Sequence, residues 1–361
     1  MIHLTMIHLA IAFSMGGYAI LIAVLFWFMP RLTRPDLYFA VTVAPGFRKK
    51  SEARSILRRY RVELVLLSAL ALALFVAGIV WLGVGFVSVG SFIQLIASFI
   101  AFYRARERVQ PYAVPPTMVR EADLHARVRI IPGGWLAAYG PFILLAAFTG
   151  YMWVHGVETL PRFSGHPGGW QQHSAVHSFS IYLLTTAGIL VVFTLFLYGL
   201  THWVRSVHAA GPEAAHELKF RRTVATVTLV TEYYLVLHAS LVLLIPRQSL
   251  ATIVLFPLAL LLVLAVLIVL ANLGQGGNRV PVTDSTLAST SAAPVGDRTL
   301  DRYWKLGVFY FNPDDSAVLI EKRFGLGYTF NFARPIAWII LLLLLMLPLI
   351  PVLAHFSRFL P

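Results

Sequence analysis

Residues 64–103 read LVLLSALALALFVAGIVWLGVGFVSVGSFIQLIASFIAFY and contain no charged side chain. A transmembrane helix needs about 20 apolar residues, each adding about 1.5 Å, to cross a hydrocarbon core about 30 Å thick. This stretch of 40 residues is long enough for two such helices. It therefore predicts two membrane helices joined by a connection near Gly83–Gly90.

Long apolar stretches also fill most of the remaining chain. Hydrophobic residues make up 58% of the sequence and charged residues 12%, with a mean hydropathy of +0.76, whereas soluble proteins carry about 25% charged residues. We predict an all-α, polytopic integral membrane protein with about eight transmembrane helices. The predicted spans are 6–29, 64–82, 86–103, 135–154, 178–200, 224–245, 250–271 and 336–355.

The 29 lysines and arginines are concentrated in alternate connections between these spans. Residues 30–61, 103–134, 201–222 and 272–335 hold 26 of them. The other three are Arg162, Arg247 and Arg358. Basic residues near membrane spans stay on the cytoplasmic side, so we expect both termini outside and the basic loops against an anionic inner leaflet. The net charge of +13 then reflects topology and not nucleic-acid binding.

The expected location is a multi-pass position in a bacterial or archaeal plasma membrane. The first span has Arg31 and Arg34 after it and no basic residue before it, the reverse of a cleavable signal peptide. The chain has no cysteine, which excludes disulfides and thiolate metal sites. The predicted regions are a seven-helix membrane region (1–272) with an extracellular histidine-rich loop (155–177), a flexible cytoplasmic linker (273–300), a cytoplasmic C-terminal module (301–335) and a last transmembrane helix (336–361).

Residues 51–61 have an amphipathic helical pattern. Helical geometry places Ala53, Ile56, Leu57 and Tyr60 on one face and four arginines on the remainder. This pattern predicts an interfacial helix whose apolar face lies in the inner leaflet and whose arginines meet anionic headgroups. An ordinary positively charged anchor with no regulatory role is the alternative.

The C-terminal module combines two β-prone runs with many aromatic residues. Residues 308–311 and 317–320 flank Asn312–Asp315, which has strong turn chemistry, so we predict a small hairpin across that turn. The module is too short to bury a core of its own. We expect it to pack against the inner membrane surface or the cytoplasmic helix ends, where tyrosine and tryptophan are favoured.

The same residues carry a family resemblance. The module is similar to an uncharacterised C-terminal domain found in bacterial polytopic membrane proteins, over about 35 positions. The residues that carry the resemblance include Tyr303, Trp304, Lys305, Tyr310, Asn312, Pro313, Asp315, Lys322, Arg323, Phe324, Gly325, Asn331 and Phe332. Arg58–Arg61, Pro115–Pro116 and Pro132–Gly134 also resemble that family, so the likeness extends over most of the chain.

Members of that family usually carry an extracellular element between spans four and five. It resembles an element of bacterial immunity and sensor proteins, typified by the immunity factor against the sporulation-delaying toxin. The corresponding stretch here, Leu160–Trp170, has lost the tryptophan of a histidine-tryptophan pair and the family spacing. Only His166 and Trp170 correspond to the pattern. The resemblance implies immunity or signalling, with a peptide or small-molecule ligand outside.

Four histidines lie in or beside this loop: His155, His166, His173 and His177. The last two are four residues apart, so one helical face could present both to a metal ion. Glu158 is the one nearby carboxylate. Hydrogen-bonding interfacial histidines, a pH response and a zinc or copper site stay open as alternatives, and we assign no metal ligand.

Glu232 is the one acidic residue placed well inside a predicted span. A charge there costs about 2.5 to 3.5 kcal/mol on insertion scales, so we expect a neutral carboxyl group facing the bundle interior. Thr228 shares its helical face, and Gln94, Thr185 and Thr186 are candidate partners from other spans. A proton relay or ligand site and a structural, hydrogen-bonded acid are equally compatible with this pattern.

Enzyme motifs are lacking: the sequence has no HExxH, GxSxG or GxxxxGK[ST]. Three functional classes follow, in order of preference: a non-enzymatic sensor or immunity-type protein of the envelope, a proton-coupled transporter or channel using Glu232, and a membrane metalloenzyme. We expect no cofactor.

Overall fold

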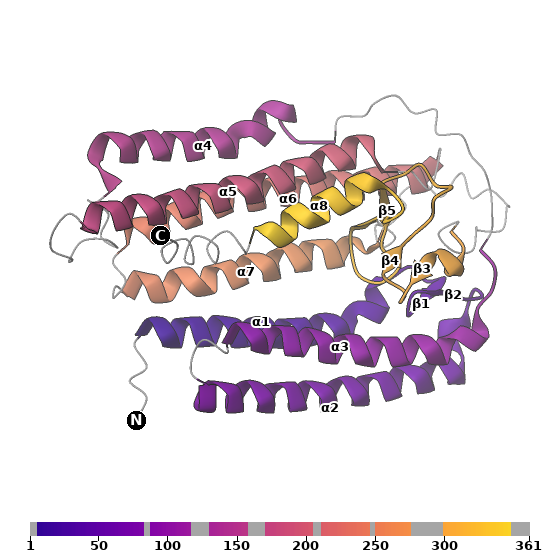
Figure 1. Cartoon of the computed structure of the whole chain (residues 1–361). Helices are drawn as coiled ribbons and strands as arrows, with labels where there is room; N and C mark the ends of the chain where they lie inside the picture. Colours follow the sequence, from indigo (N-terminus) through magenta and orange to yellow (C-terminus); the bar gives the residue numbers. More distant parts are fainter. Residues whose placement is uncertain are drawn as a thin grey trace. The chain divides into compact units, whose positions relative to one another are not determined.

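The computed structural model describes residues 6–82, 87–116, 130–157, 170–204, 211–245, 250–275 and 299–347. Within these ranges, helices dominate and the strands are short (Figure 1). The helices are α1 (Met6–Leu32), α2 (Ser51–Leu82), α3 (Val87–Val109), α4 (Gly134–His155), α5 (Trp170–His202), α6 (Gly211–Leu244), α7 (Leu250–Leu273) and α8 (Pro335–Met346). Each predicted apolar stretch coincides with one helix, as far as the structure describes it.

Four described helical segments are long and apolar enough to cross a membrane: Ser51–Gly78, Gly134–His155, Phe179–His202 and Ala215–Leu244. Shorter apolar segments lie at Gly16–Leu32, Pro257–Leu273 and Pro335–Met346. The structure therefore describes a predominantly helical protein of the membrane-spanning type. The predicted break in residues 64–103 is confirmed, because α2 ends at Leu82 and α3 begins at Val87.

The chain forms two compact units, and α6 and α7 contribute residues to both. Unit 1 comprises residues 1–126, 205–221 and 256–333, and unit 2 comprises 127–204, 222–255 and 334–361. In unit 1, α1, α2 and α3 pack together around an aromatic core that includes Phe26, Phe39 and Phe102. The Tyr60 hydroxyl donates to the Phe26 carbonyl over 2.6 Å and ties α2 to α1.

A small buried hairpin follows α1 and was not predicted. Strands β1 (Leu37–Tyr38) and β2 (Val41–Thr42) pair in antiparallel fashion. Their turn places Phe39 and Ala40 at φ of 47° and 61°, the left-handed region that non-glycine residues rarely adopt. Both residues are fully buried, and Arg106 of α3 donates to the Ala40 carbonyl over 2.6 Å. Packing and this hydrogen bond hold a turn that the sequence does not favour.

Residues 51–61 are not a separate helix, and the prediction that their apolar face lies in the inner leaflet was wrong. They form the first turns of the continuous helix α2. Ala53, Ile56 and Tyr60 do share a face, but that face is buried in the unit 1 core. The Tyr38 hydroxyl donates to the Ala53 carbonyl over 3.0 Å. The apolar face therefore contacts protein and not lipid, because the preceding hairpin covers it.

The C-terminal module contains two hairpins, but not the predicted one. Strand β3 (Trp304–Lys305) pairs with β4 (Phe309–Tyr310), and β5 (Leu319–Glu321) pairs with β6 (Tyr328–Phe330). Leu306 and Gly307, both with positive φ, form the turn that sends β4 back to β3. The predicted turn at Asn312–Asp315 exists as a side-chain-stabilised bend, since Asp314 N donates to Asn312 Oδ1, but β4 and β5 on either side do not pair with each other.

Unit 2 contains α4, α5, α8, the larger part of α6 and the first residues of α7. The Tyr233 hydroxyl on α6 donates to the Ala137 carbonyl on α4 over 3.0 Å. Gly140 of α4 leaves room for that ring, because a Cβ atom there would lie 1.8 Å from the Tyr233 hydroxyl. Tyr182 of α5 shares a hydrogen bond of 2.9 Å with Ser240 of α6. These contacts tie α6 to α4 and α5.

Candidate functional site

Glu232 lies on α6 in unit 2, and its side chain is fully buried. Thr194 of α5 approaches the carboxyl group. Within the described residues, however, neither carboxyl oxygen has a hydrogen-bond partner of standard geometry, and neither does the Thr194 hydroxyl. A buried polar group without a well-formed hydrogen bond costs about 1 to 3 kcal/mol. Glu232 is therefore a costly residue at a place where packing alone would favour an apolar one.

The other predicted members of this site have different partners. Thr228 is buried on the same helix, but its hydroxyl donates to the Val224 carbonyl over 2.8 Å. Gln94 belongs to unit 1, where its amide donates to Ser68 over 2.8 Å and to Ser98 over 3.0 Å. Thr194 was missed, because nothing in the sequence distinguishes it from the other threonines of α5.

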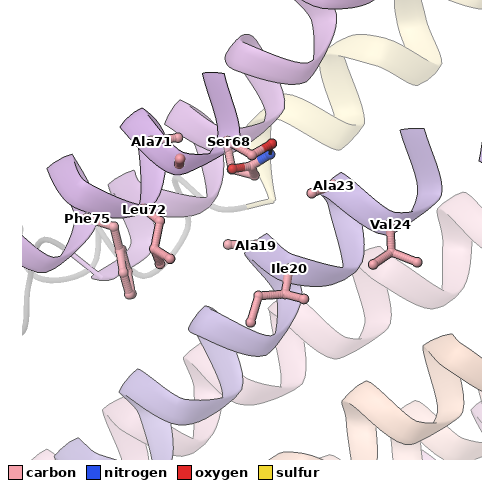
Figure 2. Close-up of a pocket in the computed structure, with 10 residues that line it drawn as sticks. Ala19, Ile20, Ala23, Val24, Ser68, Ala71, Leu72 and Phe75 are labelled. Carbon is pink, nitrogen blue, oxygen red and sulfur yellow. Dashed lines mark hydrogen bonds between the residues drawn. The ribbon is translucent and has the colours of Figure 1, made fainter. Parts of the chain in front are cut away.

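Gln94 lies beside an apolar groove of about 190 Å³. Figure 2 shows Ala19 and Ala23 of α1 on one side of the groove and Ser68 and Phe75 of α2 on the other. The small side chains on α1 leave the space. Apart from Gln94 and Ser68, the residues that line the groove are apolar. The hydrogen bond between Gln94 and Ser68 joins α3 to α2 within unit 1.

The histidine loop lies largely outside the described residues. His155 ends α4, is exposed, stacks on Tyr151 at 4.1 Å and contacts the Tyr151 carbonyl through Nδ1 at 2.9 Å. His166 lies outside the described residues, and Trp170, His173 and His177 fall in the first turns of α5, where only the backbone is described. Helix α5 thus begins earlier than predicted. No group of metal-ligating residues occurs in the described part of the chain.

Arg323 is the centre of the C-terminal module and is fully buried. Its guanidinium forms an ion pair with Asp301, donates to the carbonyl and hydroxyl groups of Thr299, and lies 5.2 Å from the Trp304 ring. The Trp304 indole also donates to the Thr299 hydroxyl over 2.8 Å. A buried arginine is stable only when its donors are paired in this way.

Asp301 connects this network to the buried hairpin after α1. Its two carboxylate oxygens accept hydrogen bonds from the Thr42 hydroxyl, over 2.8 Å, and from the Thr42 backbone N–H, over 3.3 Å. One carboxylate therefore binds both Arg323 and strand β2. Asp301 and Thr42 are 259 residues apart in sequence, so sequence spacing gave no indication of their contact.

A second network closes the module around Asn331, which is fully buried. Its amide donates to the carbonyls of Asn312, Asp315 and Ala317, and its side-chain oxygen accepts from the Asn312 backbone N–H. The Tyr310 hydroxyl donates to Asp315 over 2.9 Å. These family-signature residues hold the bend at 312–317 in place, which is a structural task.

The remaining signature residues divide between helix contacts and the surface. The Phe324 ring packs against Phe102 of α3, with ring centroids 3.8 Å apart and the rings tilted by 31°, and its centroid lies 5.6 Å from that of Phe26 of α1. Gly325 adopts φ of 103°, a conformation that glycine tolerates. Burial lowers the pKa of the Lys322 ammonium. The Phe332 ring packs against exposed Phe309. Three other signature residues lie nearer the surface: Lys305 and Pro313 are exposed, and Tyr303 is half-buried.

Charged residues gather around Tyr328 of strand β6. Burial raises the pKa of its hydroxyl well above the ordinary value, and the carboxylates of Glu321 and Glu217 raise it further, while Arg221 lowers it. Glu321 lies 3.7 Å from Arg34, just after α1. Glu217 and Arg221 belong to the start of α6, so this cluster joins α1, α6 and the β5–β6 hairpin.

The described geometry defines a class: a helical membrane protein whose C-terminal module is bonded to helix ends. Family comparison adds one match. Residues 313–338 match a family of unknown function (DUF5808), and this stretch contains β5, β6 and the start of α8. The match agrees with the predicted C-terminal domain of unknown function. No curated protein and no solved structure matches the chain.

Proposed function

We propose that the chain is a multi-pass protein of a bacterial plasma membrane, with eight spans, both termini outside and the C-terminal module in the cytoplasm. The support is the placement of 26 of 29 basic residues in alternate connections. A second support is that each of the eight apolar stretches coincides with one of the eight helices within the described residues.

Within that topology, we propose a non-enzymatic sensor or immunity-type protein. The observation that carries this proposal is that the module contacts several helix ends at once. Phe324 packs on α1 and α3, Glu321 reaches Arg34, and Tyr328 lies 6.0 Å from Phe220 of α6. Gln275, just after α7, exchanges two hydrogen bonds of 2.9 Å with Gly327. A displacement of any of these helix ends must disturb the module.

Helix α6 provides the connection between the membrane interior and the module. It carries Phe220 and Glu217 in unit 1 and Glu232 in unit 2. Residues 217 and 232 are about four helical turns apart on one continuous helix. In this proposal, a peptide or small molecule outside changes the packing around Glu232, and α6 transmits the change to the module.

A survival assay tests the proposal. A gene-deletion strain is challenged with peptide toxins and envelope stress, then complemented with wild type, Phe220→Ala or Phe309→Ala. Phe220→Ala removes the ring contact between α6 and Tyr328, whereas Phe309 is 46% exposed and serves as the control. We expect the deletion to sensitise cells and only Phe220→Ala to fail in complementation. Unchanged survival of the deletion strain under every challenge would contradict the proposal.

A second candidate is a proton-coupled transporter or channel. It is favoured by the buried Glu232 carboxyl group, which lacks standard hydrogen bonds within the described residues, because intramembrane acids commonly serve proton or ligand pathways. In vesicles, Glu232→Gln should abolish proton-coupled flux, and retained flux would exclude the relay.

A further inference from the structure

Three arginines on the first half of α2 line a groove beside α1. Arg54, Arg58 and Arg61 follow one another at intervals of four and three residues, which places them on one helical face. Trp27 of α1 forms the opposite wall, and the groove has a volume of about 570 Å³. All of these residues belong to unit 1.

The positive charge of the groove has no counter-charge among the residues that line it. No carboxylate is among them, and Glu63, the nearest acid in sequence to Arg61, forms an ion pair with Arg108. Arg61 lies 4.8 Å over the Trp27 ring. Its Nε and Nη2 atoms are buried and, within the described residues, have no hydrogen-bond partner. Arg54 and Arg58 are exposed, and the planar guanidinium group is complementary to phosphate oxygens.

Apolar side chains continue the same face of α2 toward its membrane-spanning part. Val62, Val65 and Leu66 line the groove and are 53%, 54% and 63% exposed. These residues fall inside the segment that is apolar enough to cross a membrane. The groove thus places guanidinium groups and a tryptophan above an exposed aliphatic strip, which is the order of headgroup and acyl chain in a phospholipid.

We propose that this groove binds an anionic phospholipid. The phosphate pairs with Arg54, Arg58 and Arg61, and one acyl chain lies along Val62, Val65 and Leu66. The charge selects an anionic headgroup, and the aliphatic strip selects a lipid over a soluble phosphate compound. The site rests on the membrane-spanning part of the proposed function and is independent of sensing. In the proposed topology it faces the inner leaflet.

Native mass spectrometry of the full chain, released from nanodiscs of phosphatidylglycerol and phosphatidylethanolamine, tests the site. We compare wild type with Arg58→Gln/Arg61→Gln and with the control Arg59→Gln. Arg59 is one residue away but lines a different groove, with Glu52 and Tyr112. Loss of two arginines should weaken phosphatidylglycerol retention about thirtyfold, the equivalent of about 2 kcal/mol. The control should change it less than twofold.

Three outcomes would overturn the proposal: equal loss in Arg59→Gln, equal retention of both lipids by wild type, or displacement of the bound lipid by millimolar inorganic phosphate. A second measurement keeps all arginines and so does not depend on the folding of the double variant. Because the chain has no cysteine, a single fluorophore can be attached at Val65→Cys or, on the opposite face of α2, at Leu74→Cys. Brominated phosphatidylglycerol should quench Val65 more than Leu74, and equal quenching would contradict the site.

Discussion

Arg323 shows how a single buried charge organises the C-terminal module. Its removal would take an ion-pair partner from Asp301 and a hydrogen-bond donor from Thr299. Breaking one side of a buried ion pair costs about 3 to 5 kcal/mol. Most signature residues with described partners face inward in the same way, so the family resemblance records the requirements of a fold more directly than those of a ligand site.

Arg323→Met should therefore lower the free energy of unfolding of the module by about 3 to 5 kcal/mol. Arg302→Met is the matched control, since Arg302 is exposed and, within the described part of the chain, its guanidinium contacts the Tyr303 hydroxyl and ring. Thermal unfolding in detergent measures both. Equal melting temperatures for the two variants would show that the buried network contributes little.

We expect the buried hydroxyl of Tyr38 to make the free energy of unfolding depend on pH in the alkaline range. Burial raises the pKa of its hydroxyl from 10.0 to about 12, although Arg48 and Arg61 oppose the rise. The folded state therefore holds the phenol proton more tightly than the unfolded state does. The resulting contribution to stability is fully present below pH 10, the pKa in the unfolded state, and is lost as pH rises toward 12, the pKa in the folded state. At pH 8, Tyr38→Phe should be about 1 kcal/mol less stable, because the hydrogen bond to Ala53 is lost. The difference should shrink at pH 11, and a constant difference would refute this account.

Helices α4 and α6 are held together by a close approach that only glycine permits. Gly140→Ala should destabilise unit 2 by about 1 to 3 kcal/mol, because the added Cβ would displace the Tyr233 ring. Gly150→Ala on the same helix is the control, since its Cβ meets no described atom within 4 Å. Chemical denaturation in detergent should find the control neutral or slightly stabilised. Destabilisation of both to the same extent would contradict this account, because helix propensity favours alanine over glycine at both positions.

The helices could be predicted from sequence and the strand pairings could not. Hydropathy locates spans because every backbone polar group in a membrane must be bonded within its own helix. Turn chemistry at Asn312–Asp315 identified a bend, but the choice of strand partners depends on long-range contacts such as Asn331 with the 312–317 backbone. The β1–β2 hairpin was missed because Phe39 and Ala40 give no turn signal. Thr194 was missed because helix packing decides which residue faces Glu232.

The proposed topology places residue 155 outside the cell and residue 311 in the cytoplasm. Single cysteines at exposed His155 and exposed Phe311 can be introduced into a chain that has none. A membrane-impermeant maleimide should label His155→Cys in intact cells and Phe311→Cys only after permeabilisation. The reverse pattern would show that the chain has the opposite orientation in the membrane. Labelling of both cysteines in intact cells would contradict the eight-span arrangement.

We expect α6 to connect Glu232 to the C-terminal module, and hydrogen exchange of the full chain in nanodiscs tests this connection. Glu232→Ala should increase exchange of the β5–β6 amides at residues 319–330, with α2 unchanged as a check on global unfolding. Val230→Ala, 51% exposed on the same helix, is the control and should leave exchange unchanged. Identical protection of residues 319–330 in wild type and both variants would contradict the claim.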